Sequence, residues 1–426
     1  MREKIRNLFS VEFATVFVFA VVKSYLFYSF IGIREKRILL TLLTLAFIIL
    51  IHLSCRKMIA ARVFQIVVSS LMFADVLHYR YFHQTITLQT VKFITQLPAV
   101  KGSVTQLISP EVFLLFLDIP VSMYVHRKFK GNKVQKGPLI LIPLALVLLF
   151  SVVNLEPFKV INSQEFFTYH LNDLYRSMSG DPGNEVLALS INDLPARKGE
   201  PAKNHLFGVA GGKNLIVIQV ESFQNLVINR TYNGQELTPV LNKLLQKDTL
   251  YFNNYYQQLG RGNTSDAEFV SQNSLYAPMH GQAYDIYSDK EFYGLPWILR
   301  EQGYKTVLLH GYKKEYWNRE KAYRGQGFEE FISEENFAIN EIIGMGISDK
   351  EFLRQSVTYL QGLGEPFYSF LITLTSHGPF IIPDEYATIR LLPDDQGTLF
   401  GSYLQAVAYV DYAIGEFIKY LQAAGL

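Results

Sequence analysis

The sequence predicts a bundle of transmembrane helices followed by an α/β domain with a mostly parallel sheet, and three observations lead to this fold class. Residues 1–155 hold most of the long apolar runs. Later in the chain, apolar runs of strand length alternate with helical patterns, which is typical of βαβ units. Three of these runs stop at or just before a side chain that can bind a metal or a phosphate, namely Glu221, His310 and His377. Open α/β sheets bind ligands outside the carboxyl ends of their strands, so the sequence predicts one site at these endings.

Five apolar segments are predicted to span a membrane. They are residues 11–30, 38–53, 58–77, 112–125 and 138–153. The second and the fifth contain no charged residue and approach the length of a span. The first and the third carry charged residues, mainly near their ends, where long side chains reach the membrane surface at low cost. The fourth is short and contains Asp118 and Pro120, so a kinked or re-entrant helix is the alternative for it.

Basic residues indicate how the spans are oriented. Residues 126–136 hold five lysines and arginines, the densest basic cluster beside any span. The positive-inside rule puts this loop and the amino terminus in the cytoplasm, although the basic residues at 34–37 oppose the rule. Five spans from an inner amino terminus predict a multi-pass protein of the cell membrane with everything after residue 153 on the extracellular face. The net charge of +2, with basic residues grouped at span ends, gives no reason to expect a nucleic acid partner.

The chain is predicted to have three parts. Residues 1–155 form the transmembrane domain, residues 156–213 a linker with short helices, and residues 214–426 the α/β domain. The linker is polar and rich in glycine and proline, with one helix predicted over 163–178. The predicted elements of the α/β domain are strands at 215–220, 249–252, 304–309 and 367–374, and helices at 238–247, 264–274, 291–302, 348–361 and 401–421.

The segment Gly260–Phe269 contains the first candidate for chemistry. Its glycines let the backbone approach a ligand closely, and Thr264 would sit among unpaired amide groups at a helix start, where an anionic transition state is favoured. A threonine hydroxyl needs a base or a metal to become a nucleophile. The alternative is only a well-capped helix, because Ser265 and Glu268 have the spacing of a capping box.

Glu221 is the candidate metal ligand. It follows an apolar run that suits a strand buried on both faces, so its carboxylate is desolvated unless it meets a cation or a hydrogen-bond donor. The oxygens of Glu221 and Thr264 suit Mg²⁺ or Mn²⁺, whereas a histidine ligand would admit Mn²⁺ or Zn²⁺.

Four further residues are candidates for substrate binding. Arg319 offers a planar fork to a phosphate, and Trp317 beside it can form an apolar wall. His310 and His377 follow predicted strands. The alternatives are a surface loop with one anchored aromatic for the first pair and structural histidines for the second.

Together these motifs resemble the lipoteichoic acid synthase family, polytopic membrane proteins with an extracellular sulfatase-like domain of the alkaline phosphatase superfamily. The resemblance covers the five-span layout and the chain from Asn214 onward. It implies transfer of glycerol phosphate from phosphatidylglycerol onto a polymer anchored to a glycolipid, at the bilayer surface. By this resemblance Thr264 is the nucleophile, Glu221 and Thr264 hold a divalent cation, Mn²⁺ or Mg²⁺, and His310, Trp317, Arg319 and His377 line the headgroup pocket.

One departure from the family pattern leads to a further expectation. In the family another strand follows and ends in an Asp-His pair that completes the metal site, whereas this sequence contains no Asp-His dipeptide. We therefore expect a sulfatase-like domain incomplete at its carboxyl end, with two metal ligands missing and an exposed sheet edge. Two alternative functions stay open, a non-catalytic truncated protein that binds anionic headgroups and a hydrolase of the sulfatase or phosphodiesterase type.

Overall fold

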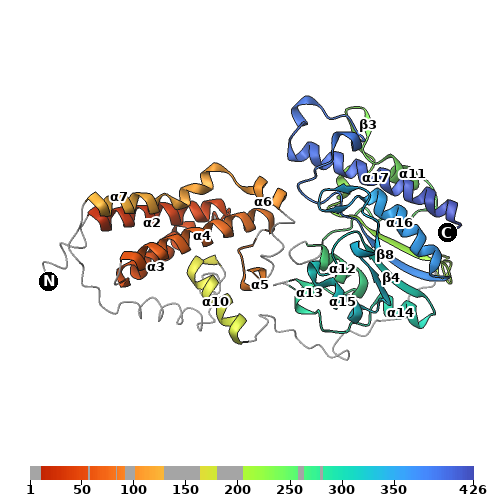
Figure 1. Cartoon of the computed structure of the whole chain (residues 1–426), viewed down its shortest axis with the longest axis horizontal. Helices are drawn as coiled ribbons and strands as arrows, with labels where there is room; N and C mark the ends of the chain where they lie inside the picture. The colour runs from red at the N-terminus through yellow and green to blue at the C-terminus, as the bar shows by residue number, and fades with distance from the viewer. Residues whose placement is uncertain are drawn as a thin grey trace. The chain divides into compact units, whose positions relative to one another are not determined.

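The computed structural model describes most of the chain as two compact units, drawn in Figure 1. One unit comprises Met1–Thr95 and Val104–Gly183, and the other comprises Gln96–Ser103 and Asn184–Leu426. The described residues are 11–55, 58–82, 84–91, 101–128, 164–179, 205–257, 263–278 and 282–426. The first unit is helical and the second is an α/β unit, as the fold class predicts.

The helical unit is built on four long or medium helices. These are α2 (Val11–Phe30), α3 (Arg37–Ser54), α4 (Met58–Phe82) and α7 (Asp118–Lys128). Between α4 and α7 come α5 (Leu88–Val91), α6 (Lys101–Leu107), whose first three residues are grouped with the other unit, and the 3₁₀ helix η2 (Pro110–Phe116). Helix α2 packs against α3 and α7, and α4 packs against η2. Buried Phe27, Leu40, Met72 and Leu115 meet in its core, so apolar burial holds this bundle together.

The structure supports fewer membrane spans than the five predicted. Among the described helices, one, over Met58–Tyr81, is long and apolar enough to cross a membrane, and Ala14–Phe30 and Arg37–His52 are shorter apolar helices. The helix predicted over 112–125 is kinked, which is the alternative that its sequence leaves open, because η2 ends at Phe116 and α7 starts at Asp118. Pro120 lies in the first turn of α7, where its missing N–H breaks no helical bond. The segment 138–153 lies outside the described residues, so the five-span count stays a prediction.

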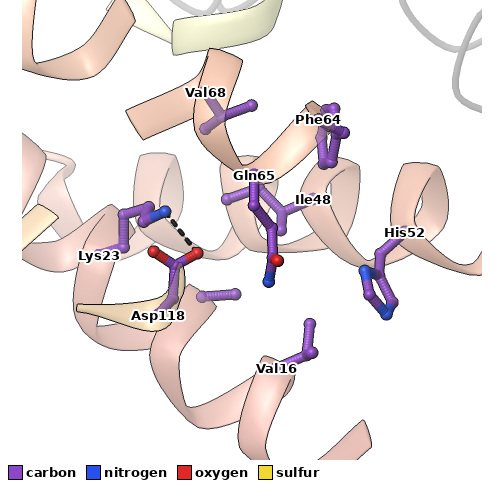
Figure 2. Close-up of a pocket in the computed structure, with 9 residues that line it drawn as sticks. Val16, Lys23, Ile48, His52, Phe64, Gln65, Val68 and Asp118 are labelled. Carbon is purple, nitrogen blue, oxygen red and sulfur yellow. Dashed lines mark hydrogen bonds and ion pairs between the residues drawn. The ribbon is translucent and has the colours of Figure 1, made fainter. Parts of the chain in front are cut away.

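A buried ion pair crosses the interior of the helical unit (Figure 2). The ammonium of Lys23 lies 2.6 Å from Asp118 Oδ2 and donates a hydrogen bond of 2.6 Å to Ser69 Oγ. A small pocket beside the pair is lined by both charged residues, by Gln65 and by apolar side chains such as Val16. The pair connects α2, α4 and α7, and breaking it would leave an uncompensated charge inside the bundle.

Polar contacts also fasten the helix α10 (Phe166–Ser179) to this unit. Just before α10, Glu165 accepts a hydrogen bond of 2.6 Å from the hydroxyl of Thr44 on α3. Within α10, His170 Nε2 lies 2.8 Å from Asp75 Oδ2 on α4. The helix predicted over 163–178 is therefore confirmed, and it belongs to the helical unit.

The α/β unit is organised around a four-stranded parallel sheet. Its strands are β1 (Leu215–Gln219), β4 (Lys305–His310), β5 (Glu330–Ile332) and β8 (Phe367–Ile372), in the spatial order β1-β8-β4-β5. In the ladder Gln219 pairs with Ile372, and His310 pairs with the same Ile372. The carboxyl ends of three strands therefore lie level at one edge of the sheet, which is where the sequence predicts the site.

Helices cover both faces of this sheet (Figure 1). Helices α16 (Asp349–Gly362) and α17 (Leu399–Ala424) pack on one face, where Val307 and Leu371 belong to a core shared with both helices. On the other face Leu308 and Phe370 pack in a core with residues of α12 (Thr264–Asn273), α13 (Ala283–Ile286) and α15 (Arg319–Gln326), and with residues of α14 (Leu295–Glu301) beside it. Burial on both faces explains why residues 307–309 of β4 and most residues of β8 are apolar without alternation.

Short elements complete the α/β unit. They are α11 (Pro239–Leu244), the hairpins β2 (Thr231–Tyr232) with β3 (Gln235–Glu236) and β6 (Ile342–Ile343) with β7 (Gly346–Ile347), and the 3₁₀ helices η4 (Asn225–Val227), η5 (Tyr316–Asn318), η6 (Glu334–Asn336), η7 (Asp384–Tyr386) and η8 (Pro393–Asp395). The strand predicted at 249–252 is wrong, since these residues have no regular structure and Leu250 and Phe252 are 69% and 75% exposed. Its apolar residues find no partner strand in the described chain, and β1 is the end strand of the sheet.

Candidate active site

Glu221 is held at the carboxyl edge of the sheet by its own backbone. It lies just beyond β1, where its N–H donates to Thr373 Oγ1 at 2.9 Å and its carbonyl accepts from Ser376 Oγ at 2.6 Å. Both partners follow β8, so the two strand endings are joined directly. Ser222 then adopts a left-handed backbone with φ of 54°.

Thr264 is the first residue of α12. The cap of this helix is Asn263, whose Oδ1 accepts from Asp266 N at 2.9 Å and from Ser265 Oγ at 2.6 Å. The capping-box alternative for Ser265 and Glu268 is therefore wrong, because Glu268 is buried and bonded elsewhere. The close approach of the backbone to a ligand that is predicted at Gly260 and Gly262 concerns residues outside the described ones.

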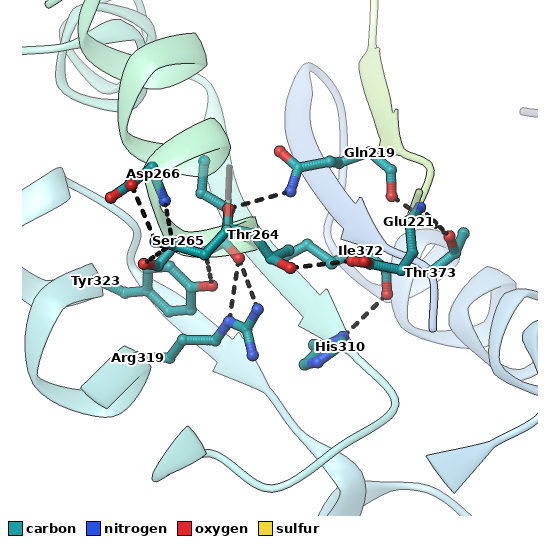
Figure 3. Close-up of polar contacts among 12 residues, drawn as sticks. Gln219, Glu221, Thr264, Ser265, Asp266, His310, Arg319, Tyr323, Ile372 and Thr373 are labelled. Atoms are coloured by element: carbon teal, nitrogen blue, oxygen red, sulfur yellow. Dashed lines mark hydrogen bonds and ion pairs between the residues drawn. The ribbon is translucent and has the colours of Figure 1, made fainter. Parts of the chain in front are cut away.

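The side chains of Thr264 and Glu221 meet in the folded chain (Figure 3). The hydroxyl of Thr264 donates to Glu221 Oε2 at 3.0 Å, although the two residues come from different elements. The other oxygen of Glu221 accepts from Ser222 Oγ at 3.1 Å. Both Thr264 and Glu221 are half-buried, so the hydroxyl is open to the pocket described below. A carboxylate that accepts the proton of a hydroxyl is suited to activate it as a nucleophile.

His310 ends β4 as a neutral, oriented imidazole. Its Nδ1 lies 3.0 Å from the carbonyl of Ile372, which can only accept, so Nδ1 carries the proton and Nε2 the lone pair. Burial, together with the positive charge of Arg319, lowers the pKa of His310 well below its usual value. At neutral pH His310 can therefore accept a hydrogen bond in the site through Nε2.

Arg319 begins α15 and is 1% exposed. Its Nη2 and Nε donate to Glu268 Oε1 at 2.7 and 3.2 Å, and the hydroxyl of Tyr323 donates to the other oxygen of Glu268. One edge of the guanidinium is therefore already bonded inside the protein. The planar fork predicted for a phosphate is limited to the remaining edge, which carries Nη1.

One pocket gathers all six predicted site residues. Glu221, Thr264, His310, Trp317, Arg319 and His377 line it, together with Tyr312, Tyr316, Met345 and Leu374, which the sequence did not single out. Trp317 has a left-handed backbone with φ of 58°, which is costly for a bulky residue and is typical of functional sites. His377 lies in the turn after β8, with Nδ1 at 2.8 Å from the carbonyl of Gly378.

Asp349, which the sequence did not single out, holds the backbone of the segment after β8 that lines this pocket. It is the first residue of α16 and is 1% exposed, and its carboxylate accepts from the N–H of Leu374 at 2.7 Å and of Thr375 at 3.1 Å. Burial raises the pKa of Asp349 to about 7. Asp349 thus holds the segment that carries Ser376 and His377. In the sequence it reads as an ordinary helix start after Ser348, so no local signal distinguishes it.

Glu221 and Thr264 fit part of a cation site. Oxygens that bind one octahedral ion at about 2.1 Å lie about 3.0 Å apart at adjacent positions, and the two oxygens here are separated by 3.0 Å. Among the residues that the structure describes, no group of three or more His, Cys, Asp or Glu side chains is arranged to hold a metal ion. The pair alone would therefore supply two ligands of a larger set.

Comparison with known families decides what kind of chain carries this site. The family model described as Sulfatase matches residues 213–426, half of the chain. The chain belongs to the sulfatase family. A second model, the lipoteichoic acid synthase N-terminal domain, matches residues 1–176 of this sulfatase-family chain. The two models together make it a protein of the lipoteichoic acid synthase family, as its motifs predict.

Individual relatives agree with this assignment. The sulfatase-family chain is 31% identical to a lipoteichoic acid synthase of Staphylococcus saprophyticus over 389 residues, covering 84% of this chain and 60% of the relative. A crystal structure of a lipoteichoic acid synthase from Listeria monocytogenes is 34% identical, with a TM-score of 0.51 over 53% of this chain and 56% of that one. The chain spans about 60% of the length of the curated relatives that it matches.

A more distant structure resembles the whole chain in fold. The integral membrane protein lipooligosaccharide phosphoethanolamine transferase A of Neisseria meningitidis aligns with a TM-score of 0.52 over 96% of this chain and 79% of that chain. The identity is 14%, so this likeness concerns the fold alone. The aligned 96% takes in most of both the helical unit and the α/β unit of this sulfatase-family chain.

Proposed function

We propose that this protein is a membrane-anchored transferase that moves glycerol phosphate from the headgroup of phosphatidylglycerol to a polymer of the lipoteichoic acid type. The observation that carries the proposal is the contact of 3.0 Å between Thr264 Oγ1 and Glu221 Oε2, at the open carboxyl edge of a parallel sheet. Membership of the lipoteichoic acid synthase family supports the substrate class. The same pocket holds neutral His310 and the cationic Arg319, which suit a phosphodiester.

The reaction proceeds in two displacements. The oxygen of Thr264 attacks the phosphorus of the headgroup, and the proton of its hydroxyl leaves along the hydrogen bond to Glu221. The bond from phosphorus to the diacylglycerol oxygen breaks, and that oxygen takes up a proton from water. Glycerol phosphate remains on Thr264 as a phosphothreonine ester. The hydroxyl of a glycolipid or polymer acceptor then attacks the same phosphorus and loses its proton to water. The bond from phosphorus to the oxygen of Thr264 breaks, and that oxygen takes back the proton held by Glu221.

The other pocket residues have separate roles in this scheme. Arg319 binds a phosphoryl oxygen through the guanidinium edge that Glu268 leaves open. His310, with Nε2 unprotonated, accepts a hydrogen bond from a hydroxyl of the glycerol. Trp317 forms an apolar wall of the pocket. His377, from the turn that follows β8, lines the pocket as well. Together they hold the headgroup in line with Thr264.

A divalent cation, Mn²⁺ or Mg²⁺, is part of the proposal. Glu221 and Thr264 are the residues of this chain that would hold it, and their oxygens have the separation that one ion requires. When bound, it supplies positive charge that stabilises an ionised threonine and the charge on the transferred group.

The helical unit keeps the site near its substrate. We place it in the cell membrane as a multi-pass anchor, with the α/β unit on the extracellular face, because its apolar helices and basic loop fit this arrangement. A tethered site meets lipid headgroups at a high effective concentration. The bilayer, phosphatidylglycerol and the acceptor polymer are then the partners of the chain.

The test replaces Thr264 with alanine in the full-length protein. Transfer from headgroup-labelled phosphatidylglycerol should fall to background, and the label should no longer become covalently attached to the protein. Thr358→Ala is the matched control, because Thr358 is exposed on α16, away from the pocket. Undiminished transfer by the Thr264 variant would end the proposal. Release of free glycerol phosphate without polymer growth would identify a hydrolase instead.

A second candidate is a non-catalytic protein that binds anionic headgroups. The observation that favours it is that the described residues contain no group of three or more metal-binding side chains. Metal analysis of the purified chain separates the two functions, since stoichiometric manganese that survives dialysis supports the transferase and its absence supports the binding protein.

A further inference from the structure

Arg319 and Glu268 form a buried ion pair at the back of the pocket. Arg319 is 1% exposed and Glu268 is 0% exposed, and only Arg319 is among the residues that line the pocket. The carboxylate accepts from Arg319 through Oε1 and from the hydroxyl of Tyr323 through Oε2. With both oxygens bonded and no exposed surface, Glu268 is not placed to act on a substrate as a base.

The pair connects the two elements that carry the reacting groups. Thr264 and Glu268 are four residues apart on α12, so they lie on the same face of that helix, one turn from each other. Arg319 is the first residue of α15. The position of its guanidinium relative to Thr264 is therefore set through a single helical turn and two hydrogen bonds of 2.7 and 3.2 Å.

The hydrogen bonds to Glu268 also set the orientation of the guanidinium. They occupy the edge with Nε and Nη2, so the edge with Nη1 is the one left for a ligand. A free arginine side chain has many rotamers, and ordering it during binding costs free energy. A guanidinium that is fixed beforehand loses little further freedom when a phosphate arrives.

We infer that Glu268 is a positioning residue of the proposed transfer site, which fixes Arg319 so that its Nη1 edge meets the phosphoryl oxygens of a headgroup at Thr264. The inference rests on the proposed function for the identity of the ligand. The competing role is electrostatic, since the carboxylate also cancels the charge of Arg319. The two roles differ in what they require of residue 268, a side chain of the right length or a negative charge.

Two substitutions separate length from charge. Glu268→Asp keeps the charge and shortens the side chain by one methylene group, whereas Glu268→Gln keeps the length and one acceptor oxygen but removes the charge. The assay is binding of glycerol phosphate to the full chain, followed by the change in tryptophan fluorescence, since Trp317, one of the two tryptophans, lines the pocket. The Asp variant should bind at least about tenfold more weakly because the guanidinium is released, and the Gln variant should stay within about threefold of the parent.

Glu351→Gln is the matched control. Glu351 bonds Arg354 through the same two nitrogens, at 3.0 and 2.9 Å, but on the outer part of α16. This variant removes the same charge from an arginine partner outside the pocket, so the affinity for glycerol phosphate should not change.

Three results would overturn the inference. They are an Asp variant that binds like the parent, a Gln variant that loses more affinity than the Asp variant, and a parent chain that does not bind glycerol phosphate. If the Asp variant does not fold, Tyr323→Phe replaces it, because it frees the other oxygen of Glu268, and unchanged affinity would count equally against positioning. Binding is measured without transfer, so failure of the Thr264→Ala test would remove the proposed reaction while leaving these affinity ratios standing.

Discussion

Replacing Asp349 with asparagine should change how the stability of the α/β unit depends on pH. Burial raises the pKa of Asp349 from 3.8 to about 7 in the folded chain. Between these values the folded state holds a proton that the unfolded state has lost, so the contribution of this group to stability falls as pH rises towards 7. A shift of this size corresponds to about 4 kcal/mol between pH 4 and pH 8. Asparagine stays neutral at every pH but keeps only one acceptor oxygen for the two N–H donors, so the free energy of unfolding of Asp349→Asn should rise relative to that of the parent by about 4 kcal/mol from pH 4 to pH 8.

Urea unfolding at a series of pH values measures this difference. Both tryptophans of the chain, Trp297 and Trp317, lie in the α/β unit, so their fluorescence reports on that unit even when the helical unit is in a micelle. Asp394→Asn is the control, because Asp394 is exposed and lies in the short helix η8. A stability difference between parent and Asp349→Asn that is constant from pH 4 to pH 8 would refute the reasoning. A parent that gains stability over the variant with rising pH would show that the two N–H donors keep the carboxylate ionised.

The remaining predictions concern the site, the helical unit and one glycine. Glu221→Gln should lower transfer by about a hundredfold or more, because Thr264 loses its proton acceptor, and should weaken manganese binding, measured by calorimetry. Lys23→Met should destabilise the helical unit by about 3–5 kcal/mol, and Asp118→Leu in the same chain should restore most of this, as judged by thermal unfolding in detergent. Gly327→Ala should cost about 2–4 kcal/mol of unfolding free energy, because φ is +95° and a Cβ would come within 2.6 Å of the Trp297 ring.

The main strands of the sheet could be predicted because a strand that is buried on both faces has apolar residues without alternation. Residues 307–309 are a continuous apolar run and residues 367–372 are apolar apart from Ser369, and both runs lie in the central strands β4 and β8. The residues after them, and Glu221 after β1, met in one pocket because parallel strands end at a common edge. The run at 249–252 is also apolar and aromatic, but it forms no strand. A strand needs a partner strand to bond with, and the composition of a segment does not show whether such a partner exists.

The parts of the site that the sequence did not show depend on long-range partners. Glu268 has the spacing of a capping box from Ser265, yet its partners are Arg319 and Tyr323, which lie 51 and 55 residues later in the chain. In the sequence Asp349 has the pattern of a helix start, whereas in the structure its carboxylate accepts a hydrogen bond from Leu374, just after the carboxyl end of β8. In both cases one acidic residue type fits a local motif and a distant contact equally well, and only the fold decides between them.

The strand order has a consequence for the way the chain is made. β8 is the last of the four strands to be synthesised, yet it occupies the place between β1 and β4. Until β8 emerges, β1 lacks the one strand with which it pairs among the described residues. The backbone of Glu221 and the imidazole of His310 then both lack their hydrogen-bond partners on and after β8. Contacts between such distant segments form slowly. In the proposed transferase, a chain that crosses the bilayer from its amino end would therefore carry an unassembled site through most of its passage, and the site would form only when β8 inserts.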